Sequence, residues 1–319
     1  MIRLLRPTAA AALLAFATVA CATSPESMRE QPVAKTVPNL EELSDWLEGT
    51  SHTTDGRATY FIQMADTQLG MSEYWLPFLL LDASWNDDQF ETDARLFESA
   101  VRHANELEPA FVIVCGDLVN RVGHAGQIAE FKRIAAMLDP AIPFYVVAGN
   151  HDVGNEPTKE TLHAYRRSFG PDRYAFREGG IHGIVLNSQI IDAPLHVPEE
   201  ADQQLSWTRD ALDRARAAGA EHIIVFLHQP FFLETAEEED QYFNIERGAR
   251  AVYLDLFEQA GVEAVLAGHY HRNASGVDGA LQMITTGPVG RPLGDDPSGF
   301  RIFEVRDGSI RQEYFSLGN

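Results

Sequence analysis

The stretch Phe144-Tyr-Val-Val-Ala-Gly-Asn-His-Asp152 is an apolar run that ends in a polar motif, and the same arrangement occurs five times along the chain. The runs have the length and composition of buried strands in a parallel sheet; they are Thr59–Met64, Phe111–Cys115, Phe144–Ala148, His222–Leu227 and Ala264–Ala267. The motifs that follow are Asp66-Thr67-Gln68, Gly116-Asp117, Gly149-Asn150-His151-Asp152, Leu227-His228 and Gly268-His269-Tyr270-His271. Because ligand sites in α/β sheets lie at the carboxyl ends of strands, we expect these motifs to converge on one edge.

The side chains in the motifs suit divalent metal ions. Carboxylate, carbonyl-type and imidazole groups bind such ions, and two ions about 3.5–4 Å apart can hold both oxygens of an in-line phosphoryl displacement. A lone Asp after a strand is usually a turn or helix-cap residue. Five such motifs in succession are not explained by turn chemistry, so the sequence predicts a metal site.

The order of the motifs resembles that of the calcineurin-like metallophosphoesterases, whose pattern is D-x-H, G-D, G-N-H-D, a later His and G-H-x-H. The match runs from about Arg57 to the end of the chain. A serine/threonine phosphatase subgroup is more similar still, in the stretches 61–68, 115–119, 186–189, 242–244 and 268–273. The resemblance implies an α/β fold, a metallophosphoesterase-type α/β/β/α sandwich of two mixed sheets flanked by helices.

The resemblance also implies two sets of metal ligands that share Asp117. The first set is Asp66, Gln68, Asp117 and His271, and the second is Asp117, Asn150, His228 and His269. Gln68 stands where most of the superfamily has His, and its neutral, hard amide oxygen favours Mn or Mg over Zn or Fe. The subgroup also carries Gln at this position, so we expect two divalent ions, with Mn preferred and Mg, Fe or Zn as alternatives, and an active enzyme.

Four further assignments concern the reacting ester. His151 is interpreted as a general acid that protonates the leaving group, with Asp152 orienting its ring; a purely structural role for His151 is the alternative. Asn120 and Arg272 are predicted to contact the phosphoryl oxygens, which gives Arg272 both a catalytic and a substrate-binding role. An ion pair behind the metal ligands is an equally good interpretation of Arg272.

The expected activity is hydrolysis of a phosphomonoester by a metal-activated hydroxide. The resemblance implies phosphoserine or phosphothreonine protein as the substrate, and a phosphorylated small molecule is the other partner considered. A phosphodiesterase acting on nucleotides or lipid headgroups is a second hypothesis. The third is a lipoprotein that binds phosphorylated ligands without turnover, and the intact motifs count against it.

The first 21 residues are predicted to be a signal peptide of the lipoprotein type. Arg3 and Arg6 precede an apolar segment that is too short to span a membrane. Thr18-Val-Ala-Cys21 resembles a lipobox, which predicts export to the bacterial cell envelope and a lipid anchor on Cys21, with the protein facing the periplasm. A soluble periplasmic protein with a free Cys21 is the alternative.

The remaining chain is divided by composition and charge. Residues 22–56 are expected to form a flexible tether and a short helix at Asn39–Glu48, and residues 57–319 the phosphoesterase domain. The net charge of −22 becomes −24 when Arg3 and Arg6 leave with the signal peptide. Such an acidic protein repels phosphate backbones, which excludes nucleic acid as a partner and leaves lipid on Cys21 as the membrane contact.

Three other features have predicted roles. Cys115 is expected to be a small buried residue. The aromatic residues of segment 70–88 are interpreted as a cover for the sheet edge or as a rim of the active site. The acidic run Glu234–Asp240 follows His228 closely and is either a solvated loop or a contact for a basic peptide around a phosphorylated residue.

Overall fold

The structure is a computed structural model that describes residues 35–38, 42–43, 59–72, 89–306 and 309–318. The predicted signal peptide, the lipobox and most of the tether lie outside the described residues, as do residues 73–88 of the aromatic segment. Residues from Ala34 to Asn319 belong to one compact unit. Among the described helices, none has the length and apolar character needed to cross a lipid bilayer.

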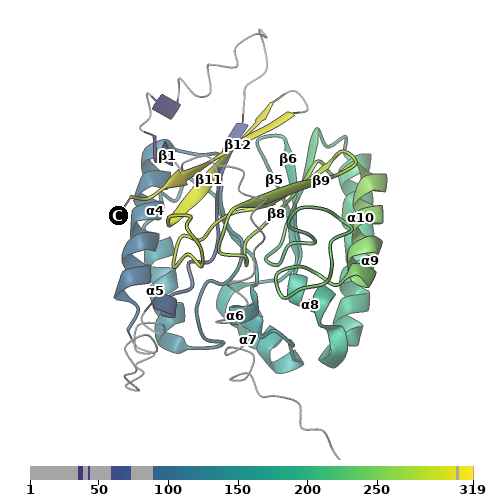
Figure 1. Cartoon of the computed structure of the whole chain (residues 1–319), viewed down its shortest axis with the longest axis horizontal. Coiled ribbons are helices and arrows are strands. Elements are labelled where there is room, and N and C mark those ends of the chain that lie inside the picture. The colour runs from purple at the N-terminus through teal and green to yellow at the C-terminus, as the bar shows by residue number, and fades with distance from the viewer. Residues whose placement is uncertain (1–34, 39–41, 44–58, 73–88, 307–308, 319) are drawn as a thin grey trace, which may run out of the picture. The chain divides into compact units, whose positions relative to one another are not determined.

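Two mixed sheets form the centre of the described unit, each with six strands (Figure 1). The first sheet runs β1 (Lys35–Thr36), β12 (Ser309–Ser316), β11 (Gly299–Arg306), β2 (Thr59–Met64), β3 (Val112–Val114) and β4 (Phe144–Val146). The second runs β5 (Tyr174–Glu178), β6 (Ile181–Val185), β7 (His222–Phe226), β8 (Ala264–Ala267), β10 (Leu281–Thr285) and β9 (Ala274–Asp278).

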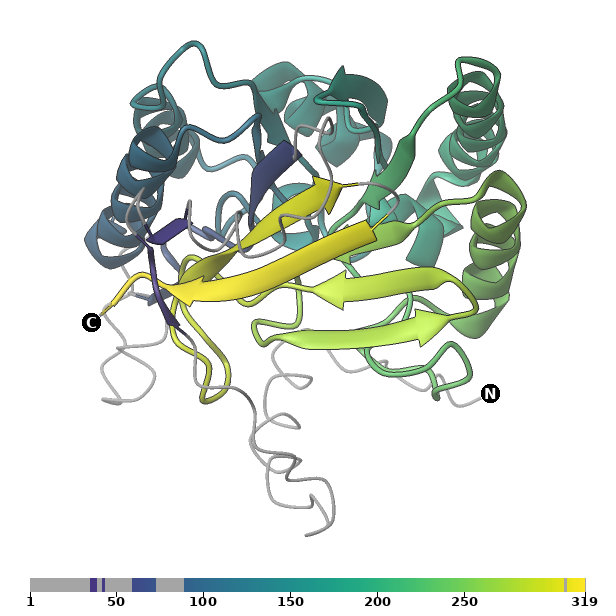
Figure 2. The same ribbon diagram turned by 90° about the horizontal axis from the view of Figure 1, so that it is seen from above.

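Helices cover the outer faces of both sheets, as the view from above shows (Figure 2). On the first sheet these are α4 (Glu91–Leu107) and α5 (Ala125–Ala135), and on the second α9 (Pro198–Ala217) and α10 (Arg247–Ala260). Further helices lie at one end of the sheets: α6 (Asn150–Val153), α7 (Lys159–Phe169), α8 (Ser188–Asp192) and the 3₁₀ helix η1 (Pro194–His196). The layers therefore form the predicted α/β/β/α sandwich.

Alternation of side chains along the strands produces the three layers of the core. In β2, Phe61 joins the cluster between the two sheets, whereas Ile62 joins the cluster under α4 and α5. In β7, Ile224 likewise points between the sheets and Val225 toward α9 and α10. Both faces of these central strands are buried, so their sequences read as continuous apolar runs. Burying each such side chain contributes roughly 1.5–3 kcal/mol.

All five predicted strands are present. β2 and β8 have the predicted bounds, and β3, β4 and β7 are each one or two residues shorter at one or both ends. The strands β2, β3 and β4 are parallel neighbours in the first sheet, and β7 and β8 are parallel neighbours in the second. Their carboxyl ends therefore bring all five motifs to the same edge of the sandwich.

The segment expected to be a tether reaches the sheet at its end. Lys35 and Thr36 form a strand that pairs in parallel with Phe315 and Ser316 of β12. Of the short helix expected at 39–48, Glu42 and Leu43 are described; both are helical, and Leu43 is buried in the core under α4 and α5. Backbone hydrogen bonding to an available edge strand explains why a polar segment is ordered here.

Candidate metal centre

Unusual backbone geometry marks the motif residues. Among the described non-glycine residues, six have a positive φ, and five of them belong to the predicted ligand set: Asp66, Gln68, Asp117, His269 and His271. The sixth, Glu108, caps the end of α4. A left-handed backbone at a residue with a Cβ costs about 1–3 kcal/mol and persists where its surroundings demand it, which is characteristic of functional sites.

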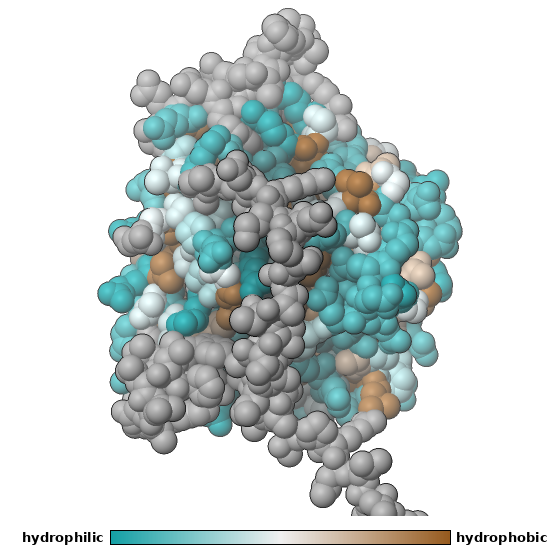
Figure 3. Space-filling model, in the orientation of Figure 1, coloured by the Kyte–Doolittle hydropathy of each residue, from teal (hydrophilic) through white to brown (hydrophobic). Residues whose placement is uncertain are grey.

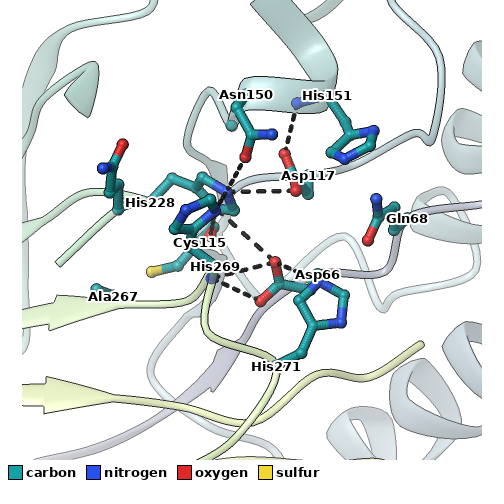
Figure 4. A network of polar contacts seen from close by, with 12 residues as sticks. Asp66, Gln68, Cys115, Asp117, Asn150, His151, His228, Ala267, His269 and His271 are labelled. Carbon is teal, nitrogen blue, oxygen red and sulfur yellow. Dashed lines mark hydrogen bonds and ion pairs between the residues drawn. The ribbon is translucent and has the colours of Figure 1, made fainter. Parts of the chain in front are cut away.

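The acidic and imidazole side chains gather in two groups that share Asp117. Asp117, His228 and His269 form one group, and Asp66, Asp117 and His271 form the other, with the possible ligand atoms of each group within 4.8 Å of one another. All five residues are buried. Figure 4 shows these side chains pointing toward a common space, with Asn150 above and Gln68 to one side. Each group consists of the Asp and His members of one predicted ligand set.

Backbone carbonyl groups hold the three histidines in fixed tautomers. The Nδ1 of His228 lies 2.9 Å from the carbonyl oxygen of Cys115, and the Nδ1 of His271 lies 2.6 Å from that of Arg291. The Nε2 of His269 lies 3.1 Å from the carbonyl oxygen of Tyr242. Each of these nitrogens donates its hydrogen to the carbonyl, so the other ring nitrogen presents a lone pair to the centre, as in metal-binding histidines.

The inward nitrogens face the oxygen ligands. His228 Nε2 lies 2.9 Å from Asn150 Oδ1 and 3.3 Å from Asp117 Oδ2. His269 Nδ1 lies 3.1 Å from the same nitrogen of His228, and His271 Nε2 lies 3.3 Å from Asp66 Oδ1. Two imidazole lone pairs that face each other across such a distance need a cation or a proton between them.

The side-chain oxygen of Gln68 indicates whether the site fits a metal ion. Its amide nitrogen donates to Asn120 Oδ1 at 3.2 Å, while its Oε1 is buried with no hydrogen-bond partner in the described part of the chain. An unpaired buried acceptor costs about 1–3 kcal/mol. A divalent ion in the cluster of Asp66, Asp117 and His271 would be a partner for that oxygen. The residues present therefore fit the predicted divalent ions.

The protonation states also suit metal binding. Burial opposes ionisation of Asp117, but the neighbouring His228, His151 and His269 outweigh it and hold the pKa of its carboxyl far below the usual range. Burial, together with His228, lowers the pKa of His269 to about 3. A carboxylate and a neutral imidazole are the forms that bind divalent ions. Burial would lower the pKa of His228, yet Asp117 and Asp66 raise it to about 9, so without an ion its inward nitrogen carries a proton that metal binding would displace.

Two glycines of the motifs are required by close packing. A Cβ on Gly149 would lie 2.2 Å from both the backbone nitrogen and Oδ1 of Asp117. A Cβ on Gly116, which has a φ of +83°, would lie 2.4 Å from the ring of His228. Glycine lets the turns approach the ligands at these positions, which explains the Gly-Asp and Gly-Asn-His-Asp patterns.

The structure corrects the predicted partner of His151. Its Nδ1 lies 2.7 Å from the carbonyl oxygen of Asn120, and its backbone N–H donates to Asp117 Oδ1 at 2.8 Å. Asp152 instead accepts hydrogen bonds from the backbone N–H groups of Leu118, Val119 and Gly149. Burial and the nearby Asp117 raise the pKa of Asp152 to about 8. Asp152 therefore positions the two turns, while Asn120 orients the imidazole, because the first turn of α6 directs the Asp152 carboxylate back toward those amides.

The remaining predicted residues lie at the side and rim of the centre. Asn120 contacts Gln68 through its side chain and His151 through its carbonyl group. The exposed guanidinium of Arg272 donates to the carbonyl oxygen of Leu293 and lies over the ring of Tyr270, 5.3 Å from its centre. Cys115 is buried, as predicted, and burial raises the pKa of its thiol.

The acidic run is an ordered loop. The Glu238 carboxylate accepts hydrogen bonds from the backbone N–H groups of Leu233, Glu234 and Thr235 and from the side chain of Asn244. The buried guanidinium of Arg250 donates to the carbonyl oxygens of Ala236, Glu238 and Ile245. This loop carries Tyr242, whose carbonyl group holds His269.

The carbonyl groups of Cys115, Tyr242 and Arg291 were not identified from the sequence. A backbone acceptor carries no residue signature, so its position depends on the tertiary fold. For Tyr242 the sequence did contain a signal, because the stretch 242–244 resembles the phosphatase subgroup and so marks this segment as part of the site.

Comparisons with known proteins agree with this geometry. The model of the calcineurin-like phosphoesterase family matches residues 59–273. Serine/threonine-protein phosphatase CPPED1 of Danio rerio is 39% identical over 264 residues, which cover 81% of this chain and 84% of that protein. The Homo sapiens protein of the same name is 39% identical over 265 residues, covering 81% of this chain and 83% of that protein.

Solved structures share the fold. A dimetal phosphatase from Danio rerio aligns with a TM-score of 0.52 at 18% identity, over 81% of this chain and 99% of that one. Purple acid phosphatase PPD1 from yellow lupin aligns with a TM-score of 0.57 at 13% identity, over 82% of this chain and 52% of that one. With the family match and the two clusters around Asp117, we conclude that the chain belongs to the calcineurin-like phosphoesterase family and is a metal-dependent phosphatase.

Proposed function

We propose that the protein hydrolyses phosphomonoesters with two divalent ions, held by the two ligand sets predicted from the sequence. The position of Asp117 in both clusters carries this proposal, because a carboxylate has an oxygen for each ion and partly offsets their mutual repulsion. Asp66, Gln68 and His271 would complete the first set, and Asn150, His228 and His269 the second. Bound there, the ions would supply a nucleophile at neutral pH and neutralise charge on the phosphoryl oxygens.

The protein's own groups would act on the leaving alcohol. The Nδ1–H of His151 donates to the carbonyl oxygen of Asn120, so in the imidazolium form the Nε2 hydrogen is the one available to protonate the departing oxygen, which leaves the neutral imidazole. Its backbone N–H also holds Asp117 in place. We assign Arg272 to a phosphoryl oxygen, which would require its guanidinium to leave the Leu293 carbonyl group when substrate binds.

Phosphoserine and phosphothreonine in proteins are the proposed substrates with the strongest support, since CPPED1 of two species is named a serine/threonine-protein phosphatase. The test is a comparison of a phosphoserine peptide, 4-nitrophenyl phosphate and bis(4-nitrophenyl) phosphate, each with Mn, Mg, Fe or Zn. Faster turnover of the two monoesters, with Mn the best activator, is expected. A preference for the diester would contradict the proposal.

We also propose that the chain is exported and anchored to the cell envelope through lipid on Cys21. The support is the signal-peptide layout of residues 1–21 and the lipobox-like Thr18-Val-Ala-Cys21. Fractionation of a Cys21→Ser variant tests this proposal.

A further inference from the structure

A pocket of about 270 Å³ lies beside the metal centre and shares Tyr242 and His269 with it. Apart from His269, its walls come from three parts of the chain: residues 155–156 after α6, residues 189–193 in and after α8, and the segment from Gln229 to Glu246 that follows β7. Any ester whose phosphorus lies at the metal centre must direct its alcohol portion to a neighbouring surface. This pocket is such a surface.

Two buried amide side chains line the pocket and are hydrogen-bonded. Gln189 and Gln229 are buried, and the amide nitrogen of Gln189 lies 3.3 Å from Oε1 of Gln229. The amide nitrogen of Gln229 in turn donates to the carbonyl oxygens of Tyr242 and Asn244. These amides are therefore occupied by one another, by the backbone and, for Gln229, by Asp192, so selectivity is expected from the other groups that line the pocket.

Those other groups are acidic. Asp192, Asp240, Glu246 and Glu156 line the pocket, and none of the described lining residues is Lys or Arg. Asp240 lies 3.7 Å from Arg250, and Glu156 lies 3.2 Å from His196. Asp192 differs, because its partly buried carboxylate accepts hydrogen bonds from the backbone N–H of Glu246 at 3.0 Å and from the side chain of Gln229 but has no cationic partner among the described residues. Burial raises the pKa of Asp192, as expected for a carboxylate without a countercharge.

An aromatic ring completes the lining. The side chain of Tyr242 is 46% exposed, and its ring centre lies 5.1 Å from that of His269. An accessible aromatic ring next to carboxylates is the combination that binds ammonium groups, through the ring face and the negative charge together.

We infer that this pocket binds a cationic group on the alcohol portion of the phosphoester and that Asp192 determines the preference for it. The inference rests on the proposed function, because it places the phosphoryl group at the metal centre. The cation can belong to a small phosphorylated amino alcohol or to a Lys side chain near a phosphoserine. Both present the same ammonium chemistry to Asp192 and Tyr242.

A pair of isosteric substrates isolates the charge. Phosphocholine and 3,3-dimethylbutyl phosphate have nearly the same shape, but only the first carries a cation in its alcohol portion. With Mn-loaded full-length enzyme, we expect kcat/KM to favour phosphocholine by about three- to tenfold, mainly through KM, as for one partly desolvated charge pair. A phosphoserine peptide with a flanking Lys, compared with its Gln counterpart, shows whether the cation is supplied by a peptide.

Variants assign the preference to the pocket. Asp192→Asn keeps an acceptor for the N–H of Glu246 and should bring the substrate ratio close to one. Glu246→Gln, at an exposed position on the pocket wall, should lower the ratio in part. Glu237→Gln is the matched control, since it removes one charge from the same acidic loop outside the pocket. Glu237→Gln should keep the wild-type ratio of kcat/KM for the two substrates.

The outcomes are separable. Equal use of the two substrates by the wild type, or an unchanged preference in Asp192→Asn, would overturn the inference. Hydrolysis of 4-nitrophenyl phosphate by the same wild-type preparation would show that the proposed function survives such a result. Absence of that hydrolysis would instead overturn the proposed function.

Discussion

At the scale of single residues, Asp117 is the one described Asp or His of the centre that belongs to both clusters. One carboxylate oxygen accepts the backbone N–H of His151, and the other faces His228 at 3.3 Å. It belongs to both clusters, whereas each of the other residues belongs to one. The consequences of removing it should therefore differ from those of removing a ligand of a single cluster.

Asp117→Asn should weaken binding of both ions and reduce turnover by more than about 10²-fold, since even residues that only support metal ligands contribute 10–100-fold. Calorimetric titration with Mn checks the affinities. Asn150→Ala is the comparison. The Asn150 side chain contacts His228, which belongs only to the group of Asp117, His228 and His269, so this substitution should weaken one binding event. Wild-type affinity for both ions in Asp117→Asn would count against the shared position.

His151→Ala should keep metal binding but lose about 10²–10⁴-fold in turnover of esters with poor leaving groups, the usual contribution of a positioned proton donor. An activated aryl phosphate has a good leaving group and should be affected much less. Steady-state rates on phosphoserine and 4-nitrophenyl phosphate measure this difference. Equal losses on both substrates would remove the assignment of His151 as a general acid.

At the scale of elements, the loop between β7 and α10 depends on Arg250 of that helix. The guanidinium is 1% exposed and donates to carbonyl oxygens of Ala236, Glu238 and Ile245. This arrangement keeps the carbonyl group of Tyr242 beside His269. The stability of the loop and the orientation of a metal ligand are therefore coupled.

Arg250→Met should lower the free energy of unfolding by about 2–4 kcal/mol, because it leaves buried carbonyl groups without donors. It should also weaken one of the two metal-binding events. Denaturant unfolding and Mn titration measure the two effects. The exposed Arg247→Met is the control and should change stability by less than about 1 kcal/mol. Equal effects of the two substitutions would contradict the role given to Arg250.

The strands and their motifs could be predicted from the sequence because both signals are local. A strand with two buried faces is a continuous apolar run, and each polar motif follows one directly, as at Asp66 after β2. The partner of His151 could not be predicted in this way. Asp152 is adjacent in sequence, yet the imidazole contacts the carbonyl group of Asn120, whose position depends on the turn after β3.

At the scale of the whole molecule, the described residues on the face shown in Figure 3 are mostly hydrophilic, and the apolar residues among them are scattered. The sequence predicts a lipid on Cys21 as the membrane contact. Cys21→Ser should move the protein from the membrane fraction to the soluble periplasmic fraction, because it removes the residue that would carry the acyl chains. Stable anchoring needs more than one such chain. Fractionation and mass spectrometry of the N-terminus measure this change. A soluble wild-type protein with a free Cys21 thiol would refute the anchor.

The central claim is a centre of two ions around Asp117, and the metal content of the purified protein tests it most directly. The full-length protein, loaded with Mn and passed through a desalting column, is measured by elemental analysis together with protein concentration. Two ions per chain are expected, falling below two in Asp117→Asn. One ion or none per chain in the Mn-saturated wild type would contradict the account.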